Sequence, residues 1–318
     1  MHALATGGAG FIGSHLCEAL SKQGWSVTIL DNFSSGSKQN IQQLLNQKSK
    51  TVHLYEGDCT DSRSVRKSLK DVDIVFHFAA NPEVRLELCD PVTCFQQNVY
   101  ATHVLLEEIK NSQIHTIVFA STSTVYGEAK VIPTPEDYSP LEPISVYGAS
   151  KLASEALVTA YAHSFNKNVV ILRLANIVGP RSQHGVIHDF ISKIKSNPHE
   201  LEILGDGTQR KSYLYIDDCI EAILVSLKNQ NRRVDVFNVG SEDHVDVKTI
   251  ASIVAEEMGC KETRFKFTGG VEGGRGWIGD IKTMLLDVNK LKKLGWKPKL
   301  NSEEAIRKAT RDLLRQRF

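Results

Sequence analysis

The sequence carries no excess of either charge. Its 318 residues include 38 Lys and Arg against 37 Asp and Glu, which gives a formal net charge of +1. A chain with this balance lacks the broad electrostatic field that draws a protein to nucleic acid or to an acidic membrane surface, so we expect neither as a partner. Local cationic sites are still compatible with this balance.

Long apolar runs are also missing. No stretch approaches the ~20 apolar residues that a membrane helix needs. Met1 leads into a short apolar run, without the charged region, long apolar stretch and cleavage site of a signal peptide. Hydrophobic residues still make up 41% of the chain, which is ample for a buried core. We therefore expect a cytoplasmic globular protein with no membrane association.

The cysteines lack the spacings of a metal or redox site. They form no C-x-x-C pair, and no His lies beside them in zinc-finger spacing. We interpret them as buried thiols in a reducing compartment and expect no metal site. They are Cys17, Cys59, Cys89, Cys94, Cys219 and Cys260.

What the sequence does contain is a regular alternation of short apolar runs with longer amphipathic segments. This alternation predicts βαβ units, right-handed crossovers and a parallel sheet covered by helices on both faces, which is a doubly wound α/β fold. The expected strands are His2–Thr6, Ser26–Leu30, Val52–Tyr55, Asp73–Phe78, Thr116–Ala120 and Val169–Leu174. A last amphipathic helix is expected over Ser302–Arg317.

In the second half of the chain the alternation of apolar and amphipathic segments is less regular, and Gly and Pro residues separate shorter elements. We expect residues 1–174 to form one domain and residues 175–318 to form mainly a smaller C-terminal lobe. Residues 212–240 are expected to return to the first domain, because Asp217–Leu227 has a helical pattern and Asp235–Val239 has the pattern of a buried strand.

A glycine-rich segment, Thr6–Gly13, joins the first expected strand to a helix that is expected to begin near Phe11. Gly7, Gly10 and Gly13 allow a tight turn, a close approach of backbone to phosphate, and close packing of helix on strand. The helix N-terminus adds N–H donors and partial positive charge. The segment predicts a pyrophosphate-binding loop, although a glycine trio alone is weak evidence.

An acidic residue strengthens this prediction. Asp31 ends the second apolar run, 18 residues after Gly13 (31 − 13). A carboxylate there can bind both ribose hydroxyls and repels the 2′-phosphate of NADP, so NAD is the expected cofactor. The alternative, a glycine turn with a surface Asp and no ligand, does not account for the strand–turn–helix context.

Tyr147 and Lys151 stand at positions i and i+4 of an expected helix, so both side chains lie on one face. A tyrosine pKa of ~10 is too high for a base at neutral pH, but a nearby ammonium and a nicotinamide cation favour the phenolate. The pair can then act as an acid/base. In an arbitrary sequence this spacing is usually a tyrosine near an unrelated lysine, so the assignment depends on the neighbouring motifs.

One neighbouring motif is the hydroxyl-rich segment Ser121–Gly127, which follows an expected strand. Ligands of α/β sheets bind at the carboxyl ends of strands, so these hydroxyls are placed to hydrogen-bond a substrate alcohol.

With these motifs in order, the chain resembles the extended short-chain dehydrogenase/reductase family, of the nucleotide-sugar epimerase and dehydratase kind. The resemblance covers nearly the full length and implies a Rossmann NAD-binding domain followed by a substrate-binding lobe. Its motifs are TGGAGFIGSH at 6–15, DNFSSG at 31–36, HFAA at 77–80, STSTVYG at 121–127, YGASK at 147–151 and RLANIVGPR at 173–181.

The resemblance also implies roles for individual residues. Tyr147, Lys151 and Thr122 would be catalytic, with Lys151 holding the nicotinamide ribose and lowering the pKa of Tyr147. The residues implied for NAD are Gly7, Gly10, Phe11, Ile12, Gly13, Asp31, Asn32, Ser34, Ser35, Gly36, Asp58, Cys59, Phe78, Ala79, Ala80, Asn98, Tyr147 and Lys151.

A second implied set contacts a UDP-sugar substrate. Arg210, Lys211 and Arg275 are the cations available for its diphosphate, since two phosphates need neutralisation and forked Arg donors suit them. Solvated surface charge is the alternative for these three. The full set is Arg85, Thr122, Ser123, Thr124, Tyr147, Asn176, Val186, Ile187, Phe190, Arg210, Lys211 and Arg275.

The two residues after Thr122 bear on the reaction. Members of the family that are 4,6-dehydratases carry Asp and Glu there, whereas this chain has Ser123 and Thr124, which cannot act as carboxylate acid/bases. Decarboxylases of the family place a Glu where Thr124 stands. We therefore expect a 4-epimerase of a UDP-hexose, with UDP-glucose/UDP-galactose as the first choice.

Other substrates and classes stay open. Lys211–Ser212 stand where galactose epimerases carry Arg-Asp, Gly185 stands where many relatives have a substrate-binding Asn, and Arg85 could hold a phosphate or a C6 carboxylate. UDP-N-acetylglucosamine or UDP-glucuronate 4-epimerase, another nucleotide-sugar oxidoreductase or dehydratase, and an NAD-binding sensor are the alternatives. The resemblance also implies a homodimer through Pro91–Lys110 and Val146–Phe165.

Overall fold

The computed structural model describes residues 1–46, 51–85 and 90–316. Its chain forms two compact units. Unit 1 comprises residues 1–125, 146–173 and 223–237, and unit 2 comprises residues 126–145, 174–222 and 238–318. Compared with the expected division at residue 174, residues 126–145 leave the first unit, and the returning segment is shorter than 212–240.

Unit 1 is built on a seven-stranded sheet in the order β11-β6-β5-β4-β1-β2-β3. Its pairings run parallel, for example Ala3 with Val27 on one side of β1 and Ala3 with Ile74 on the other. The strands are β1 (His2–Thr6), β2 (Ser26–Asp31), β3 (Val52–Glu56), β4 (Ile74–His77), β5 (Thr116–Thr122), β6 (Asn168–Leu174) and β11 (Val234–Val239). The doubly wound α/β fold is thereby confirmed, and the predicted strands are correct to within two residues at each end.

The strand order reverses between β1 and β4. From β1 the chain moves outward through β2 to β3, then crosses to β4 and moves the other way. In open α/β sheets this reversal leaves a crevice beyond the carboxyl ends of the two strands, where ligands bind. The glycine-rich segment follows β1 and the HFAA motif ends β4, so both expected cofactor motifs lie at this reversal.

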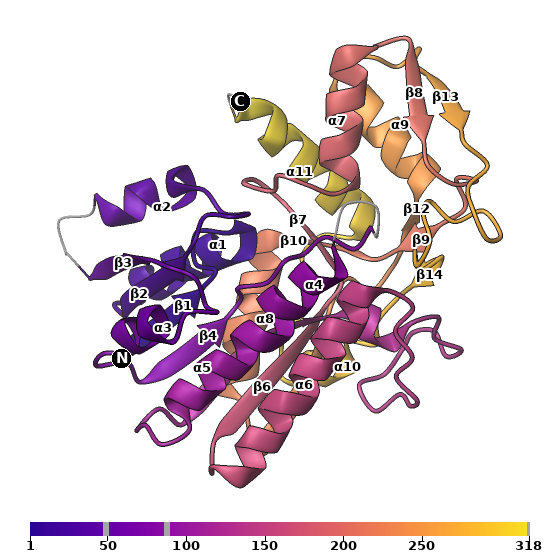
Figure 1. Cartoon of the computed structure of the whole chain (residues 1–318). Helices are drawn as coiled ribbons and strands as arrows, with labels where there is room; N and C mark the ends of the chain where they lie inside the picture. The colour runs from indigo at the N-terminus through magenta and orange to yellow at the C-terminus, as the bar shows by residue number, and fades with distance from the viewer. Residues whose placement is uncertain (47–50, 86–89, 317–318) are drawn as a thin grey trace. The chain divides into compact units, whose positions relative to one another are not determined.

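The helices of unit 1 cover the sheet because each presents an apolar side to it. Helix α5 contacts both α3 and α6, and Figure 1 shows α5 and α6 side by side along the sheet. Leu105, Phe119 and Val158 belong to the core that they share with β4, β5 and β6. The helices are α1 (Phe11–Lys22), α2 (Lys38–Leu45), α3 (Ser62–Ser68), α4 (Pro91–Cys94), α5 (Ala101–Ile109) and α6 (Val146–Ser164).

The expected helix over Pro91–Lys110 is not regular. A π-helical turn, η1 (Phe95–Tyr100), separates α4 from α5. Pro91 follows the cap residue Asp90, whose carboxylate accepts from the N–H groups of Val92 and Thr93, so the start of the helix agrees with its sequence. Periodicity cannot reveal a single wider turn within an otherwise helical pattern.

Unit 2 contains three small sheets and the remaining helices. Its sheets pair β10 with β7, β9 with β12 and β14, and β13 with β8. The strands are β7 (Asn176–Val178), β8 (Glu200–Ile203), β9 (Arg210–Lys211), β10 (Tyr213–Tyr215), β12 (Val245–Asp246), β13 (Arg264–Phe267) and β14 (Thr283–Met284). The helices are α7 (Val186–Ser196), α9 (Val247–Glu257), α10 (Asn289–Lys293) and α11 (Ser302–Arg315), while α8 (Ile216–Lys228) is shared between the units.

The last expected helix is present as α11, which ends at Arg315, two residues before its expected end. Arg317, the last residue of the expected helix, lies outside the described residues. Its cap is Asn301, whose side chain accepts from the N–H of Glu304 while the Glu304 carboxylate accepts from the N–H of Asn301. This reciprocal pair satisfies two backbone donors at the helix start.

The cysteines agree in part with the expectation of buried thiols. Cys17, Cys59, Cys94 and Cys219 are buried, whereas Cys260 is half-buried. Cys89 lies outside the described residues. In the part of the chain that is described, no helix is long and apolar enough to span a bilayer, and no group of His, Cys, Asp and Glu side chains is arranged to hold a metal ion.

Candidate active site

The turn after β1 is shaped by its glycines. Gly7 has a positive φ of 68°, and a Cβ there would lie 2.6 Å from the backbone nitrogen of Ala79. A Cβ on Gly13 would lie 2.2 Å from the carbonyl oxygen of Gly7. Side chains at either position would therefore prevent the close packing of this turn on β4 and on the start of α1.

The start of α1 suits an anionic ligand. Gly10 is its N-cap and offers no side chain to its first N–H groups. Phe11 and Ile12 occupy the first helical positions and are half-buried. Backbone N–H groups and the helix dipole together favour a phosphate at such a terminus, so this turn fits the pyrophosphate of a dinucleotide.

Asp31 lies where the ribose specificity of a dinucleotide is set. Its carboxylate accepts 2.8 Å hydrogen bonds from the N–H groups of Ala9 and Phe33, and the residue is 7% exposed. Burial raises the pKa of Asp31, and the two backbone hydrogen bonds oppose that rise. The carboxylate has further lone pairs for two ribose hydroxyls, so its position fits NAD.

The next cofactor candidates form a polar cluster around Asp58. Asn32 donates to Asp58 at 2.7 Å, and the N–H of Ser34 donates to the Asn32 carbonyl at 3.0 Å. Hydrogen bonds from Thr60, Asn32 and Gln97 lower the pKa of Asp58 despite the opposing effect of burial. The structure thus brings the 31–36 and 58–59 motifs together.

The remaining residues of these motifs differ in exposure. Ser35 is exposed, Gly36 is half-buried beside Asp31, and Cys59 is buried, which raises the pKa of its thiol to about 12. Phe78, Ala79 and Ala80 follow β4 and are half-buried, with the Ala79 N–H directed at the Thr6 hydroxyl over 3.3 Å.

Tyr147 and Thr122 meet at the end of β5. The Thr122 hydroxyl hydrogen-bonds the Tyr147 side chain. The Thr122 hydroxyl also accepts from the N–H of Thr124 at 3.2 Å and from its hydroxyl at 3.1 Å. Thr122 and Ser123 are buried, and Thr124 is half-buried. The strand end and the helix start expected to carry the reaction therefore lie in contact.

The protein groups alone leave the pKa of Tyr147 high. Burial raises it to about 12, and the hydrogen bond with Thr122 offsets only part of the rise. The lowering expected from Lys151 together with a nicotinamide cation stays a prediction. A further positive charge beside the phenol is needed before it can act as a base near neutral pH.

Lys151 lies one helical turn after Tyr147 and is only 3% exposed. Its ammonium lies 4.3 Å from the centre of the Phe119 ring, a favourable cation–π distance. Burial lowers the pKa of Lys151 to about 7, and the negative charge of Glu155 opposes that decrease. The protonation state of this lysine is consequently sensitive to its neighbours.

Asn98 lies within the π-helical turn η1 and is buried. Its amide donates to the Ser150 hydroxyl at 2.8 Å, and its carbonyl accepts from the N–H of Asn81 at 2.7 Å. The Ser150 hydroxyl donates in turn to the Tyr147 carbonyl at 2.8 Å. Asn98 thus connects the segment after β4 with the start of α6.

The expected substrate residues of unit 2 have structural partners. Asn176 donates its amide to the Ser212 carbonyl at 3.0 Å. On α7, Ile187 and Phe190 are buried at 4% and 2% exposure, and Val186 is half-buried. The two buried side chains contribute to the core of their unit, which is not the exposure expected of direct ligand contacts.

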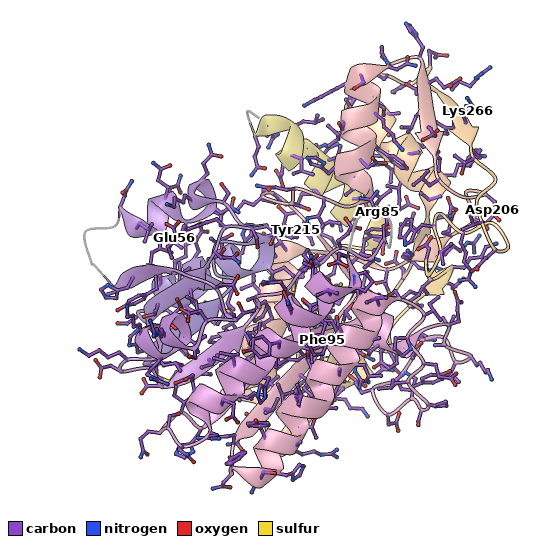
Figure 2. The ribbon with its side chains drawn as sticks, in the orientation of Figure 1. Glu56, Arg85, Phe95, Asp206, Tyr215 and Lys266 are labelled. Atoms are coloured by element: carbon purple, nitrogen blue, oxygen red, sulfur yellow. The ribbon has the colours of Figure 1, made fainter. Side chains whose placement is uncertain are left out.

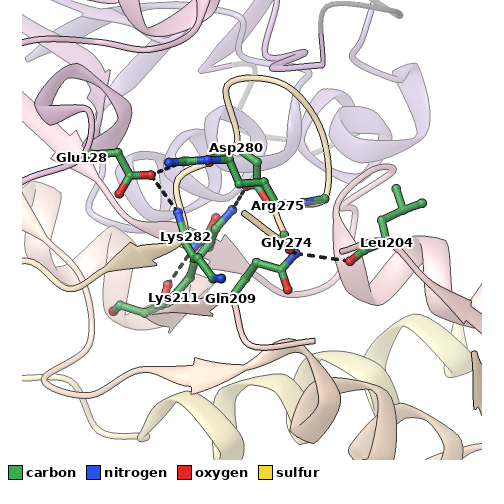
Figure 3. A network of polar contacts seen from close by, with 11 residues as sticks. Glu128, Leu204, Gln209, Lys211, Gly274, Arg275, Asp280 and Lys282 are labelled. Carbon is green, nitrogen blue, oxygen red and sulfur yellow. Dashed lines mark hydrogen bonds and ion pairs between the residues drawn. The ribbon is translucent and has the colours of Figure 1, made fainter. Parts of the chain in front are cut away.

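The three expected cations also differ. Arg210 is exposed, whereas Lys211 pairs with Asp280 at 2.5 Å. Arg275 pairs with Glu128 and also donates to the Asp280 carbonyl at 2.7 Å; Figure 3 shows these contacts together. Lys211 and Arg275 are therefore not free cations in this structure.

Arg85 occupies the segment after β4. It pairs with Glu83 at 3.1 Å and is partly exposed (Figure 2). The carboxylate beside it neutralises the charge that was expected to hold a phosphate or a C6 carboxylate.

Sequence reasoning missed a buried group behind the expected catalytic residues. Glu155 and Arg173 form an ion pair with both side chains 6% exposed, and the Ser121 hydroxyl donates to Glu155 at 2.5 Å. Glu155 can be noticed in the sequence because it stands four residues after Lys151. The sequence does not show that Arg173, on a separate strand, is its partner.

Comparison with known proteins identifies the family. The NAD dependent epimerase/dehydratase family matches residues 3–240. The chain belongs to this family. It is an NAD-dependent nucleotide-sugar epimerase or dehydratase, and NAD is its cofactor.

The similarity extends over whole chains. A putative UDP-glucose 4-epimerase of Methanocaldococcus jannaschii is 34% identical over 96% of this chain and 96% of its own length. A crystal structure of a UDP-galactose 4-epimerase has a TM-score of 0.89 and 43% identity over all of both chains. A UDP-glucuronic acid 4-epimerase from Bacillus cereus, in complex with UDP-glucuronic acid and NAD, has a TM-score of 0.87 and 32% identity over 98% of each chain.

Proposed function

We propose that the chain is a 4-epimerase of a UDP-hexose, with UDP-glucose/UDP-galactose as its substrate pair. The contact between Thr122 and Tyr147, next to Ser123 and Thr124, carries the proposal. Hydride transfer and one proton movement need only a hydroxyl acid/base, whereas dehydration needs further acid/base groups that these two residues do not supply. The similarity to UDP-glucose and UDP-galactose 4-epimerases supports this choice.

In the proposed mechanism, Tyr147 takes the proton from the sugar 4-hydroxyl while Thr122 orients that hydroxyl by hydrogen bonding. Bound NAD would supply the acceptor and donor of the hydride at C4. Epimerisation of a transient 4-keto sugar would require the sugar to turn between oxidation and reduction, and Tyr147 would then return the proton to the 4-oxygen. The sugar gains and loses the same two electrons, so no external oxidant is consumed.

Lys151 has the second role. As an ammonium it hydrogen-bonds the nicotinamide ribose and supplies part of the positive charge that Tyr147 needs to release its proton. Gly7, Gly10 and Gly13 hold the pyrophosphate, and Asp31 holds the adenosine ribose. We propose that unit 1 binds NAD and performs the reaction, and that unit 2 binds the nucleotide-sugar.

A second candidate is UDP-glucuronate 4-epimerase. It is favoured by the similarity to the Bacillus cereus protein and by Arg85, a cation available for a C6 carboxylate. The pairing of Arg85 with Glu83 places this candidate second, because that cation must first lose a partner.

The deciding test is to incubate the purified protein separately with UDP-glucose, UDP-galactose, UDP-N-acetylglucosamine and UDP-glucuronate, without added cofactor, and to measure the 4-epimers by chromatography. Interconversion of glucose and galactose forms supports the first candidate. Accumulation of NADH when NAD is in excess would instead indicate a net dehydrogenase. A protein that binds NAD but neither converts any of these sugars nor reduces NAD would act on another nucleotide-sugar, catalyse another reaction or be a sensor.

We also propose that the protein is a homodimer formed through α4, η1, α5 and α6. Val92 on α4 is 59% exposed, Phe95 and Tyr100 on η1 are 57% and 45% exposed, and Val146 at the start of α6 is 40% exposed. Phe95 is labelled in Figure 2. Large apolar side chains gathered on one helical segment indicate an interaction surface.

Phe95→Glu tests the dimer, because a charge at a buried apolar contact opposes association. We expect light scattering to give a dimer for the wild type at micromolar concentration and a monomer for the variant. Tyr55→Glu, at a residue 40% exposed on β3, is the matched control and should remain dimeric. A monomeric wild type would contradict the proposal.

A further inference from the structure

A buried ion pair lies directly behind the expected catalytic residues. The Arg173 guanidinium donates to the Glu155 carboxylate through Nε at 3.1 Å and through Nη2 at 2.8 Å. Both side chains are 6% exposed. Two donors on one carboxylate hold it in a defined orientation as well as satisfying its charge.

The pair joins three elements of unit 1. Glu155 belongs to α6, Arg173 to β6, and the Ser121 hydroxyl, which donates to Glu155 at 2.5 Å, to β5. Ser121 immediately precedes Thr122, and Glu155 lies one helical turn after Lys151 and two after Tyr147. The three side chains therefore connect the strand end that carries Thr122 with the helix that carries the other two catalytic candidates.

Glu155 also acts on Lys151 through its charge. The ammonium faces the Phe119 ring of β5, and Glu155 on its own helix supplies the opposing negative charge. From β4, His77 is neutral near pH 7 because burial, with help from Lys151, lowers its pKa to about 3.

Two further groups near Lys151 contribute no negative charge that would favour its ammonium. Tyr147 on α6 is protonated in this structure, since its pKa is raised to about 12, and Arg173 on β6 is neutralised by Glu155. Among the described groups that face Lys151, Glu155 is thus the one whose negative charge favours the ammonium.

A buried ion pair is a weak source of stability, because desolvation opposes the attraction between its charges. Replacement by apolar residues of similar volume is often neutral or stabilising. A pair placed behind a reaction centre is therefore better explained by what it positions than by what it stabilises.

We propose that Glu155, held by Arg173 and Ser121, is a positioning residue that keeps Lys151 protonated and fixes the distance between Thr122 and Tyr147. The inference rests on the proposed function for the roles of those three residues. It adds a group that touches neither substrate nor cofactor and acts through its neighbours.

The test uses four variants of the full-length protein containing NAD. Glu155→Gln alone leaves Arg173 buried without its carboxylate and can fail to fold. The double variant Glu155→Gln/Arg173→Met removes both charges and keeps an acceptor for Ser121. Ser121→Ala leaves the ion pair intact and removes only the connection to β5, and Ser121→Thr restores a hydroxyl.

The first readout is the titration of Lys151 by NMR of ε-¹³C lysine, assigned with Lys151→Met and recorded without substrate. Loss of an opposite charge close to a titrating group moves its pKa by about 1 unit or more, and here the direction is downward. Glu155→Gln removes only the negative charge, so in that variant we expect Lys151 to titrate at least about 1 unit lower, whereas the double variant removes one charge of each sign and should move the titration less. An unchanged titration in the folded variant would overturn the charge role.

The second readout is epimerase turnover against pH. Because the ammonium is lost at lower pH in Glu155→Gln, the alkaline limb of kcat should move down with the Lys151 titration in that variant. We expect kcat near pH 7.5 to fall roughly tenfold or more while KM changes little, since the residue does not touch the sugar. A variant that only loses thermal stability, with the pH profile of the wild type, would contradict the proposal.

Ser121→Ala addresses the geometric role. We expect it to lower kcat without moving the Lys151 titration, and we expect Ser121→Thr to recover most of the loss. Wild-type kcat in Ser121→Ala would overturn the geometric role. If the wild type converts none of the sugars while the Lys151 titration still moves, the charge role stands and the proposed function falls.

Glu257→Gln is the matched control. Glu257 is 11% exposed and pairs with Arg307 and Arg311 in unit 2, so the variant also removes a largely buried carboxylate from an arginine pair. It should lower thermal stability but leave both the Lys151 titration and the pH profile unchanged. A shift in the control equal to that in Glu155→Gln would assign the effect to general destabilisation and overturn the inference.

Discussion

The two units hold their charged groups in different ways. In unit 1, Glu155 and Arg173 are each 6% exposed and lie behind the residues proposed to carry the reaction. In unit 2, Arg275 and Lys282 are 21% and 34% exposed and pair with Glu128 and Asp206, which are themselves 39% and 34% exposed; the pair of Arg275 with Glu128 is drawn in Figure 3. Buried pairs are costly to rearrange, whereas partly exposed pairs exchange partners at low cost.

This difference suits two tasks. Proton and hydride transfer need groups fixed within a fraction of an ångström, which a buried pair with bidentate hydrogen bonds provides. Binding a diphosphate needs cations that can leave one anion for another, and we propose that Arg275 is such a cation.

The largest effect should come from Tyr147→Phe. Removing the phenol removes the acid/base, so we expect kcat to fall by roughly 10²–10⁴-fold, with NAD content and circular dichroism unchanged. Chromatographic assay of the 4-epimers measures the loss. Retention of more than a few per cent of turnover by a folded, NAD-containing variant would show that another group moves the proton.

A direct comparison of the units comes from charge removal. Glu155→Gln should lower the free energy of unfolding by about 3–5 kcal/mol, because it leaves a buried guanidinium without its carboxylate. Lys282→Gln, which breaks the pair with Asp206 in unit 2, should change it by only about 0–1 kcal/mol, because that pair is partly solvated. Urea denaturation followed by fluorescence measures both changes. Equal losses of unfolding free energy would contradict the proposed difference between the buried pair of unit 1 and the partly exposed pairs of unit 2.

The sequence predicted unit 1 better than unit 2 for a physical reason. Buried parallel strands are short apolar runs separated by helices, so periodicity alone located β1, β2 and β5. In unit 2, strands such as β9 and β14 are two residues long and have no period to detect. Motifs that lie close to one another in the chain or at strand ends also made predictions possible. They indicated the glycine turn, the position of Asp31 and the contact of Tyr147 with Thr122.

The sequence alone does not show which residues far apart in the chain pair with each other. Lys211 and Arg275 appeared as available cations because their partners, Asp280 and Glu128, are 69 and 147 residues away. The connection of Glu155 to Arg173 was hidden for the same reason.

The next effect concerns cofactor choice. Asp31→Ser removes a carboxylate proposed to bind two ribose hydroxyls. Charge-assisted hydrogen bonds contribute about 1.5–3 kcal/mol each, so we expect the Kd for NAD to rise at least roughly tenfold. Loss of the negative charge should also narrow the preference for NAD over NADP. Titration of NAD and NADP into protein freed of its cofactor measures both, and Asp61→Ser, at the exposed cap of α3, is the control.

The smallest effect should appear in unit 2 and should concern binding rather than turnover. If Arg275 leaves Glu128 to hold the diphosphate, Arg275→Gln should raise KM for the UDP-sugar by about tenfold, the loss of one charge-assisted hydrogen bond, with kcat within about twofold of the wild type. Glu128→Gln should act in the opposite direction, because it removes the carboxylate that competes with the diphosphate for Arg275. A fall in kcat with unchanged KM in Arg275→Gln would show that this cation serves the reaction itself, and the assignment of fixed charges to one unit and exchangeable charges to the other would no longer hold.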